Sequence, residues 1–252
     1  MTFLRSILFM TLAVLLLPPF VVLLFLLCWL PKRPLRRFSM IMVVITAAMI
    51  KYVLRIDYRL IGAENIPAGP CVILSKHQSA WETIFLQYIF KWTAFVYKRE
   101  LHWVPFLGWG LAIMPFVPID RGAGKDALFQ VAKRGTQRLR EGYSIVIFPE
   151  GTRVAPGTQK RYKGGGAYLA KHAGVPVAPV ALNSGEFWPR QAFIKHPGTV
   201  TVSIGPPIDP AELSAEDINR RAEEWIETEM RRISPHLYGN PSETPPPACT
   251  GV

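Results

Sequence analysis

The sequence predicts an α/β fold in which helices flank a mainly parallel sheet, with an N-terminal apolar two-helix membrane anchor. Three observations lead to this prediction. Short runs rich in Val, Ile and Phe alternate with longer helical stretches over most of the chain, as strands and helices do around a parallel sheet. Half of the 252 residues are hydrophobic, and they are concentrated at the N-terminus. The length suits one domain of ordinary size with an appendage.

The first apolar segment is long enough to enter a membrane. No charged residue occurs from Ser6 to Leu30, and these 25 residues reach ~37 Å as a helix, beyond the ~30 Å hydrocarbon core of a bilayer. Pro18 and Pro19 are expected to kink or break this helix. A second apolar run, 38–50, is short for a full crossing. A single kinked span and a pair of helices dipping into one leaflet both remain open.

A cleaved signal peptide is rejected, because the apolar stretch is too long and PKRPLRR follows it in place of a cleavage site. The basic residues after the segment are expected on lipid headgroups; they are Lys32, Arg33, Arg36 and Arg37. If the segment spans the membrane, these four cations outweigh Arg5 before it. The positive-inside rule then puts the bulk of the chain in the cytoplasm.

The net charge of +11 indicates anionic membrane lipids rather than nucleic acid as the partner. A basic cluster beside an apolar anchor is typical of a membrane surface, and no RNP motif or GxxG clamp is evident. The three cysteines (28, 71 and 249) form no disulfide framework and no metal-binding spacing. Their placement fits a reducing cytoplasm.

The rest of the chain divides into short strands and longer helices. Strands are expected at 71–75, 93–97, 116–119, 144–148, 177–181 and 199–204. Helices are expected at 79–90, 125–141, 164–173 and 214–233, the last with Ser214 as N-cap and Glu216 and Asp217 in its first turn. We therefore expect three parts: the membrane anchor 1–55, a domain at 56–234 and a Pro-rich disordered tail at 235–252.

The stretch LHWVPFLGWGLAIMPFVPID, residues 101–120, is unusually apolar and contains two Trp and two Gly. One interpretation is buried core. The other is a wall that faces a membrane or lines an acyl chain. Both use the same residue types, so the sequence leaves the two open.

The stretch VILSKHQSAWET, residues 72–83, places a histidine just past a predicted strand. Ligands bind beyond the carboxyl ends of parallel strands, so His77 is a candidate base with Glu82 as its partner. Two residues five apart on one ideal helix point ~140° away from each other, so His77 must precede the helix and fold back. Ser79 and Glu82 also form S-x-x-E, a capping box. One carboxylate oxygen can serve each role, and spacing alone leaves catalysis and capping open.

Two further clusters are suited to binding an anion. In PIDRG, Arg121 follows a predicted strand, where its fork of donors can hold a phosphate or pair with Asp120. In FPEGTR, residues 148–153, a glycine lets backbone amides approach an anion, and a hydroxyl and a guanidinium follow. The alternative is a type II turn with a surface arginine. No motif nominates a serine or cysteine nucleophile, since GxSxG and HExxH are missing.

The order HX4E, PIDRG, FPEGTR and then VPVAPV resembles the glycerolipid acyltransferase family. The similarity covers roughly residues 60–207 and points to its bacterial 1-acyl-sn-glycerol-3-phosphate acyltransferases. Two positions depart from the family pattern: Glu82 stands where Asp is commoner, and Val154 stands where Ser usually follows the arginine. The basic doublet of the family is matched by Lys98 and Arg99.

The resemblance implies a role for each motif. His77 acts as general base on an acceptor hydroxyl, and Glu82 orients and charge-balances its imidazole. The hydroxyl attacks a thioester directly, so no enzyme nucleophile is needed. The substrate phosphate is bound by residues of the other motifs, namely Lys98, Arg121, Glu150, Gly151, Thr152 and Arg153.

The implied reaction transfers an acyl group from acyl carrier protein or acyl-CoA to the 2-hydroxyl of lysophosphatidic acid, giving phosphatidic acid for phospholipid synthesis. The resemblance implies no metal and no organic cofactor. It places the protein in the cell inner membrane, with the catalytic domain on the cytoplasmic side. Two alternatives stay open: an acyltransferase for another lyso-lipid acceptor, and a non-catalytic membrane protein that binds anionic lipid.

Overall fold

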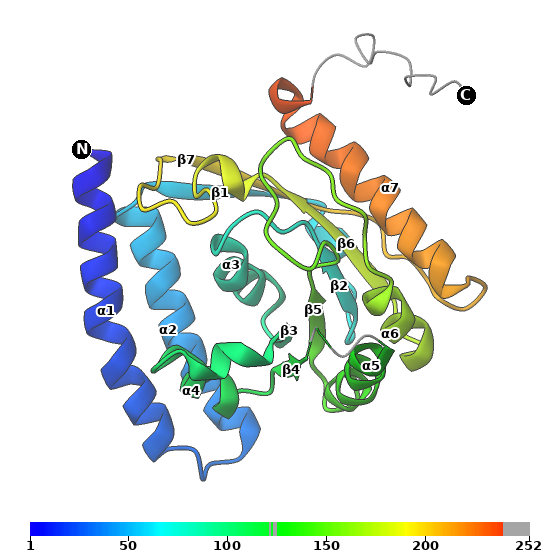
Figure 1. The fold of residues 1–252 in the computed structure, drawn as a ribbon, viewed down its shortest axis with the longest axis horizontal. Coiled ribbons are helices and arrows are strands. Elements are labelled where there is room, and N and C mark those ends of the chain that lie inside the picture. Colours follow the sequence, from blue (N-terminus) through cyan, green and yellow to red (C-terminus); the bar gives the residue numbers. More distant parts are fainter. Residues whose placement is uncertain (121, 123–124, 239–252) are drawn as a thin grey trace.

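The computed structural model of the chain describes residues 1–120, 122 and 125–238 (Figure 1). Its helices are α1 (Thr2–Leu26), α2 (Lys32–Tyr52), α3 (Trp81–Phe90), α4 (Leu107–Ile113), α5 (Lys125–Arg140), α6 (Gly165–Ala173) and α7 (Ala215–Ile233). Its strands are β1 (Ile56–Ile61), β2 (Val72–Ser75), β3 (Thr93–Lys98), β4 (Val117–Ile119), β5 (Ser144–Ile147), β6 (Val177–Leu182) and β7 (Gly198–Ile204). Short 3₁₀ helices are η1 (Ala63–Asn65), η2 (Arg99–Trp103), η3 (Ser184–Glu186) and η4 (Pro235–Leu237).

The strands form one sheet in the order β1-β7-β6-β2-β5-β3-β4. All neighbouring pairs are parallel except β6 and β7, which are antiparallel. The predicted α/β class and mainly parallel sheet are therefore confirmed. The parallel strands β5, β2 and β6 lie side by side at the centre, so their carboxyl ends meet at one edge.

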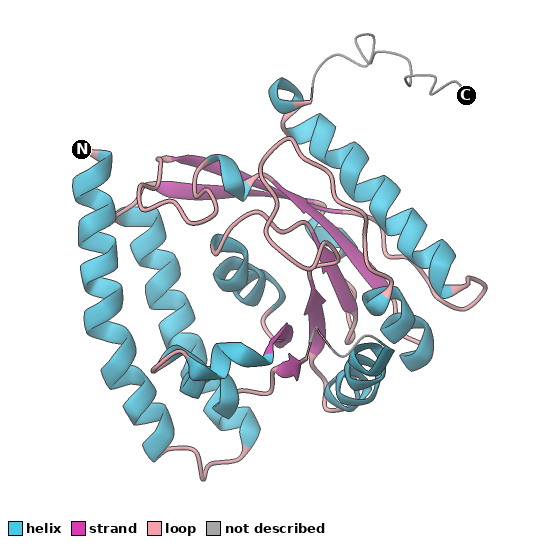
Figure 2. Ribbon diagram, in the orientation of Figure 1, coloured by secondary structure: helices cyan, strands magenta, loops and turns pink. Residues whose placement is uncertain are grey.

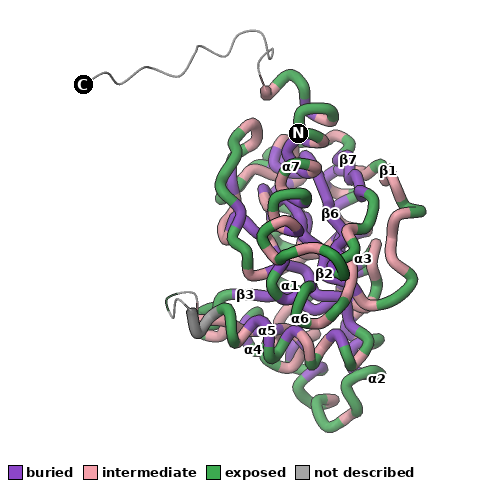
Figure 3. Tube along the Cα trace, turned by 90° about the vertical axis from the view of Figure 1, so that its right-hand side faces the viewer, coloured by how far each residue is buried: buried purple, intermediate pink, exposed green. Residues whose placement is uncertain are grey.

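Helices cover both faces of this sheet, giving three layers (Figures 1 and 2). Successive residues of a strand point to opposite faces. Val72 and Leu74 pack in a core with residues of α5, α6 and α7, whereas Ile73 packs in a second core with residues of α2 and α3. The central strands are buried on both sides (Figure 3), which explains why the sequence shows them as continuous apolar runs.

The predicted strands and helices are all present, with ends within two residues of those expected. Ser214 caps α7 as predicted, because its hydroxyl accepts the backbone N–H of Asp217 at 3.1 Å. Besides the short 3₁₀ helices, two described elements were not predicted. Strand β1 lies at the sheet edge, with Asp57 half-exposed and Arg59 exposed, so its composition gives no buried-strand signal. Helix α4 lies inside the apolar stretch 101–120, where no periodicity marks it.

The N-terminal helices differ from expectation in length and continuity. Helix α1 runs without a break through Pro18 and Pro19, so of the two expected effects, a kink or a break, the break is wrong and the kink stays a prediction. Helix α2 begins at Lys32, before the apolar run that marked it in the sequence. Pro34 fits its first turn, because the first backbone amides of a helix have no intrahelical partner. Within the described residues, α1 is the one helix long and apolar enough to cross a membrane, with a mean hydropathy of 2.7.

Arg36 does not lie on lipid headgroups, contrary to expectation. Its side chain is buried, and Nη2 donates to the side-chain oxygen of Gln87 at 2.9 Å and to the carbonyl of Thr93 at 3.4 Å. Nη1 donates to the hydroxyl of Ser39 at 3.1 Å. Burial lowers the pKa of Arg36 to about 10, so it stays protonated at neutral pH. This buried cation joins α2 to α3 and β3.

Residues 1–55 contribute side chains to the core of the α/β layers. Phe9 of α1 and Ile50 of α2 are buried in the same cluster as Trp81 of α3. The division at residue 55 thus stays a prediction, and no break in packing marks it. At the other end, the expected disorder from 235 is wrong for Pro235–Leu237, which form η4, with His236 3.1 Å from a carboxylate oxygen of Glu186. Residues 239–252 lie outside the described residues.

Candidate active site

The chain segments that leave β2, β5 and β6 converge at one edge of the sheet, because these neighbouring strands are parallel. The segment after β2 carries His77. The segment after β5 carries Phe148 and the rest of FPEGTR. The segment after β6 carries Ser184. Residues more than 100 positions apart in the sequence are thereby brought into contact.

Glu82 connects the histidine to the start of helix α3. Its Oε2 lies 2.5 Å from Nδ1 of His77. Its Oε1 accepts the backbone N–H groups of Gln78 at 2.9 Å and Ser79 at 2.7 Å, and also the hydroxyl of Ser184. The hydroxyl of Ser79 accepts the backbone N–H of Trp81 at 3.1 Å. Helix α3 begins at Trp81 with Ala80 at its N-cap and no side-chain cap, so the expectation that Ser79 is the N-cap of a full capping box is wrong. One oxygen of Glu82 binds the backbone just before the helix and the other binds the imidazole, so a structural role and a role on His77 are compatible.

This arrangement fixes which nitrogen of His77 can act as a base. A carboxylate only accepts hydrogen bonds, so Nδ1 carries the hydrogen and donates to Glu82. The lone pair is then on Nε2, which forms no hydrogen bond with any residue that the structure describes. The ring stacks on Phe148 with centroids 3.8 Å apart and is 14% exposed. The imidazole is thus held on two sides while Nε2 is available for substrate.

His77 lines a cavity of about 510 Å³. Among the described residues that line it, three are cations, Lys98, Arg153 and Arg190, and none is acidic. The remaining wall is largely apolar and comes from α3, β3, η2, α4, Phe116 and Phe148. The cavity can therefore hold a molecule with one anionic group and an apolar portion, next to a base.

The predicted phosphate-binding residues occupy different positions. Lys98, Thr152 and Arg153 line the cavity with His77, although Nζ of Lys98 is also 3.2 Å from the carboxylate of Glu100. Arg121 lies outside the described residues. Asp120 pairs with Arg99 at 3.0 Å.

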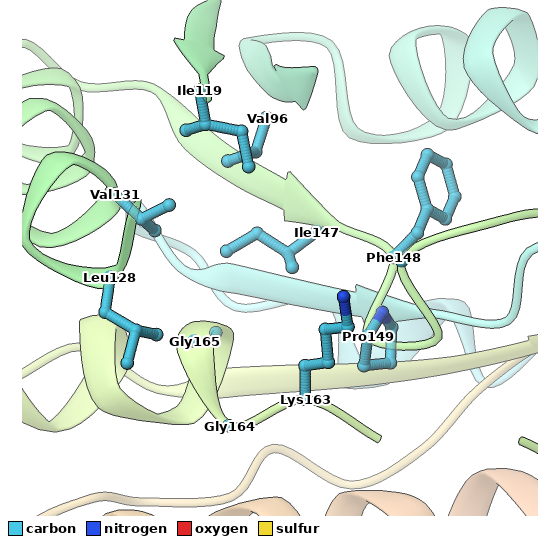
Figure 4. Close-up of a pocket in the computed structure, with 12 residues that line it drawn as sticks. Val96, Ile119, Leu128, Val131, Ile147, Phe148, Pro149, Lys163, Gly164 and Gly165 are labelled. Atoms are coloured by element: carbon cyan, nitrogen blue, oxygen red, sulfur yellow. The ribbon is translucent and has the colours of Figure 1, made fainter. Parts of the chain in front are cut away.

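Gly151 and Glu150 do not line the His77 cavity. Gly151 has φ of +71°, a left-handed conformation that favours glycine in this turn. It lies next to the flexible end of Lys163. Gly151 lines a second cavity, of about 350 Å³. Figure 4 shows the apolar side chains that surround it and Lys163 rising beside Pro149. Phe148 and Val96 line both cavities, which therefore adjoin.

Glu150 belongs to a buried ion cluster beneath His77. Its Oε1 accepts the backbone N–H of His77 at 3.4 Å and lies 3.5 Å from Nζ of Lys76. Lys76 is also 2.7 Å from Glu227 of α7, whose carboxylate accepts the hydroxyl of Tyr162 at 2.8 Å. Burial raises the pKa of Glu150 to about 7. Glu150 therefore supports the histidine loop from below and does not line the His77 cavity.

Several site residues were not foreseen from the sequence. Ser184 follows β6 just as His77 follows β2. Its place as a polar residue just past a strand's carboxyl end could have marked it as a site residue. Arg190 sits in the loop after η3, and its Nη1 donates to the carbonyl of Arg153 at 3.2 Å. No motif marks it. In the part of the chain that the structure describes, no three His, Cys, Asp or Glu side chains gather as a metal site.

Comparison with known proteins identifies the family of the chain. The model of the Acyltransferase family matches residues 57–183. A Pseudomonas aeruginosa protein named 1-acyl-sn-glycerol-3-phosphate acyltransferase is 47% identical over 183 residues, which cover 71% of each chain. A human protein, 1-acyl-sn-glycerol-3-phosphate acyltransferase beta, is 31% identical over 73% of this chain and 67% of its own.

A solved structure shares the fold. The crystal structure of the 1-acyl-sn-glycerophosphate (LPA) acyltransferase PlsC from Thermotoga maritima aligns with a TM-score of 0.77 over 92% of this chain and 95% of its own. At 23% identity, this likeness bears on the fold alone. The family model and the Pseudomonas relative, with its identity of 47%, carry the assignment: the chain belongs to the Acyltransferase family.

Proposed function

We propose that the protein transfers an acyl group to the 2-hydroxyl of 1-acyl-sn-glycerol-3-phosphate, giving phosphatidic acid. The observation that carries this proposal is the His77–Glu82 pair, whose Nε2 opens into a cavity lined by cations and apolar side chains. The names of the relatives supply the acceptor. The donor is a fatty acyl thioester of acyl carrier protein or of coenzyme A, and the enzyme acts in phospholipid synthesis.

The geometry supports a direct transfer. The acceptor hydroxyl donates its hydrogen bond to Nε2 of His77, and Nε2 takes the proton as the oxygen attacks the thioester carbonyl. Glu82 stabilises the imidazolium that forms. The C–S bond then breaks, and the thiolate leaves with the proton from Nε2. One ester and one thiol are produced, and no covalent enzyme intermediate is needed.

The phosphate of the acceptor is proposed to lie against the cations of the His77 cavity. Lys98 and Arg153 line it together with Thr152, and Arg121 is proposed to join them from the loop after β4. The absence of acidic side chains among the described lining residues favours an anion there. The two adjoining apolar cavities offer surface for acyl chains, which both substrates carry.

Membrane association is proposed through α1, on the cytoplasmic side of the cell inner membrane. Both ends of α1 contact the rest of the chain: Ser6 accepts the backbone N–H of Lys195 at 3.0 Å, and Val21 lies against Gly110 of α4. A helix packed along its length on a partly polar body does not cross a bilayer without taking that body with it. These contacts favour a helix lying within one leaflet over a crossing.

Purified protein assayed with labelled acyl donors against a panel of lyso-acceptors tests this function. We expect labelled phosphatidic acid from 1-acyl-sn-glycerol-3-phosphate, with much less product from neutral or zwitterionic lyso-lipids. A preference for another lyso-lipid would transfer the activity to that acceptor. Failure to acylate any acceptor while vesicles of anionic lipid are bound would identify a non-catalytic lipid-binding protein.

A further inference from the structure

The segment formed by η2 and α4 exposes large aromatic side chains. Trp103 is 86% exposed and Trp109 is 48% exposed. Val104 and Leu107, which lie between them, are also exposed. Isolated exposed apolar residues are ordinary, but four within seven positions on one short segment form a patch, and such patches mark interaction sites.

This exposure is built into a well-defined segment. A Cβ at Gly108 would be 2.4 Å from the carbonyl oxygens of both Leu101 and His102, so α4 packs backbone to backbone on η2 and only glycine fits. The hydroxyl of Tyr97 is hydrogen-bonded to His102, which joins η2 to β3. The aromatic side chains are therefore held outward by close packing of the backbone beneath them.

The inner side of the same segment lines the catalytic cavity. Leu101, Leu107 and Leu111 belong to the wall of the cavity that contains His77. Leu107 is also 42% exposed on the outside. The segment is thus thin at this point, with the candidate active site on one side and the exposed aromatic patch on the other.

The patch continues the apolar surface of α1. Helix α4 packs against α1, where Gly110 faces Val21 near the carboxyl end of that helix (Figure 1). The turn between α1 and α2 follows a few residues later and presents Trp29, which is 77% exposed. The first turn of α2 adds the exposed cations Lys32 and Arg33. Exposed tryptophans beside basic residues and an apolar helix are typical of the interface of a lipid bilayer.

We propose that η2 and α4 insert into the interface of the bilayer beside α1 and form the passage by which lipid enters the His77 cavity. The occupant is the lipid surface and not a second copy of the chain, because the patch is continuous with the most apolar helix of the molecule. The role as a passage rests on the proposed function; the insertion does not. Lipid substrate reaches Nε2 past Leu107 without leaving an apolar environment.

Insertion is tested on the full chain by a depth-sensitive probe. In a background with Cys28→Ser and Cys249→Ser, Trp103→Cys is labelled with an environment-sensitive fluorophore and bound to phosphatidylglycerol and phosphatidylethanolamine vesicles that carry nitroxide lipids. Tyr168→Cys is the control, because Tyr168 is exposed on α6, across the sheet from α1. We expect the nitroxide lipids to quench most of the fluorescence of a probe at position 103 and to leave the fluorescence of a probe at position 168 unchanged.

Two outcomes overturn the proposal. No quenching at 103 shows that the segment stays in water, and equal quenching at both positions shows that contact with lipid is not specific to this segment. A probe at 103 that is shielded from aqueous quenchers but untouched by the nitroxide lipids shows a protein neighbour. This experiment needs no turnover, so it holds or fails independently of the acyltransferase assay.

The passage is tested by kinetics. Trp103→Ser is expected to raise the apparent KM for vesicle-borne acceptor roughly tenfold, the factor that corresponds to ~1.4 kcal/mol, while kcat and the KM in detergent micelles stay unchanged. Tyr168→Ser is the matched control and is expected to change neither value. An equal effect in vesicles and micelles would show a structural role only and would overturn the passage.

Discussion

Replacing Glu82 by glutamine tests whether this residue acts on His77 or only caps a helix. Glutamine keeps one acceptor oxygen and gains two N–H donors. In wild type, Oε1 accepts three donors, from Gln78, Ser79 and Ser184. Turning the new NH₂ toward them would leave two buried backbone N–H groups unpaired, which costs ~1–3 kcal/mol each, or roughly 2–6 kcal/mol together. The amide oxygen therefore stays at the cap and the NH₂ faces His77.

That orientation places the proton of His77 on the wrong nitrogen. The NH₂ donates to Nδ1, so the ring hydrogen moves to Nε2, the atom that must accept the proton of the substrate. A positioned general base contributes ~10²–10⁴-fold to the rate, and loss of the correct tautomer in a serine protease triad costs ~10⁴-fold. We expect kcat for Glu82→Gln to fall by roughly 10²–10⁴-fold. The free energy of unfolding should change by ~1 kcal/mol or less, the order of one hydrogen bond, because the amide oxygen of glutamine still accepts the backbone N–H groups of Gln78 and Ser79.

The measurement is initial-rate acyl transfer with purified protein, with the melting temperature as the control for folding. Glu82→Asp keeps the charge but shortens the reach by one methylene. It should be partly active and should exceed Glu82→Gln, because Nδ1 still faces an acceptor. Wild-type turnover in Glu82→Gln would refute the reasoning and return this residue to a purely structural role.

Three further predictions concern other parts of the site. His77→Ala should lower kcat by roughly 10²–10⁴-fold with an unchanged melting temperature; retention of more than half the activity would remove His77 as the base. Arg153→Ala should raise the KM for 1-acyl-sn-glycerol-3-phosphate and leave the KM for the acyl donor unchanged. The control Lys160→Ala removes an exposed cation away from the cavity and should change neither KM. Arg153→Lys should restore the wild-type KM only in part, since lysine has no bidentate fork. Equal effects on both substrates would argue against an acceptor-phosphate site. Because burial raises the pKa of Glu150 from 4.5 to about 7, the folded state retains a proton that the unfolded state releases, so stability should fall as pH rises between these values, by up to ~3 kcal/mol. In urea unfolding at several pH values, the free energy of unfolding should depend less on pH in Glu150→Gln than in wild type. An unchanged pH dependence would show that Glu150 does not cause this fall in stability.

The parts of the site that are local in sequence could be predicted. His77 and Glu82 are five residues apart, and the end of a strand and the start of a helix between them limit how they can lie. The sequence allowed one carboxylate oxygen for each role without deciding it, and the structure has this arrangement. The sheet was predictable for a similar reason, because strands buried on both faces leave continuous apolar runs.

Residues whose partners are distant could not be predicted. Arg36 was assigned to lipid because it follows an apolar segment, yet it is buried against Gln87 and the carbonyl of Thr93, 51 and 57 positions away. Arg190 reaches the site only because the loop after η3 folds back onto Arg153. An arginine has the same charge and the same sequence neighbours whether it lies on the surface, in the core or in the site. The sequence alone therefore does not show which of these positions it occupies.

The ion cluster connects the His77 loop to a helix outside the matched family segment. That segment ends at residue 183, and Glu227 lies beyond it on α7. Glu227 nonetheless is 2.7 Å from Nζ of Lys76, the residue before His77, and Glu150 contacts both Lys76 and the backbone of His77. A buried cation that loses its partner destabilises a protein by ~3–5 kcal/mol. The motifs supply the proposed reacting groups, but α7 supplies a carboxylate that neutralises the charge buried beneath them, and we expect the loop that carries His77 to shift when that charge loses its partner.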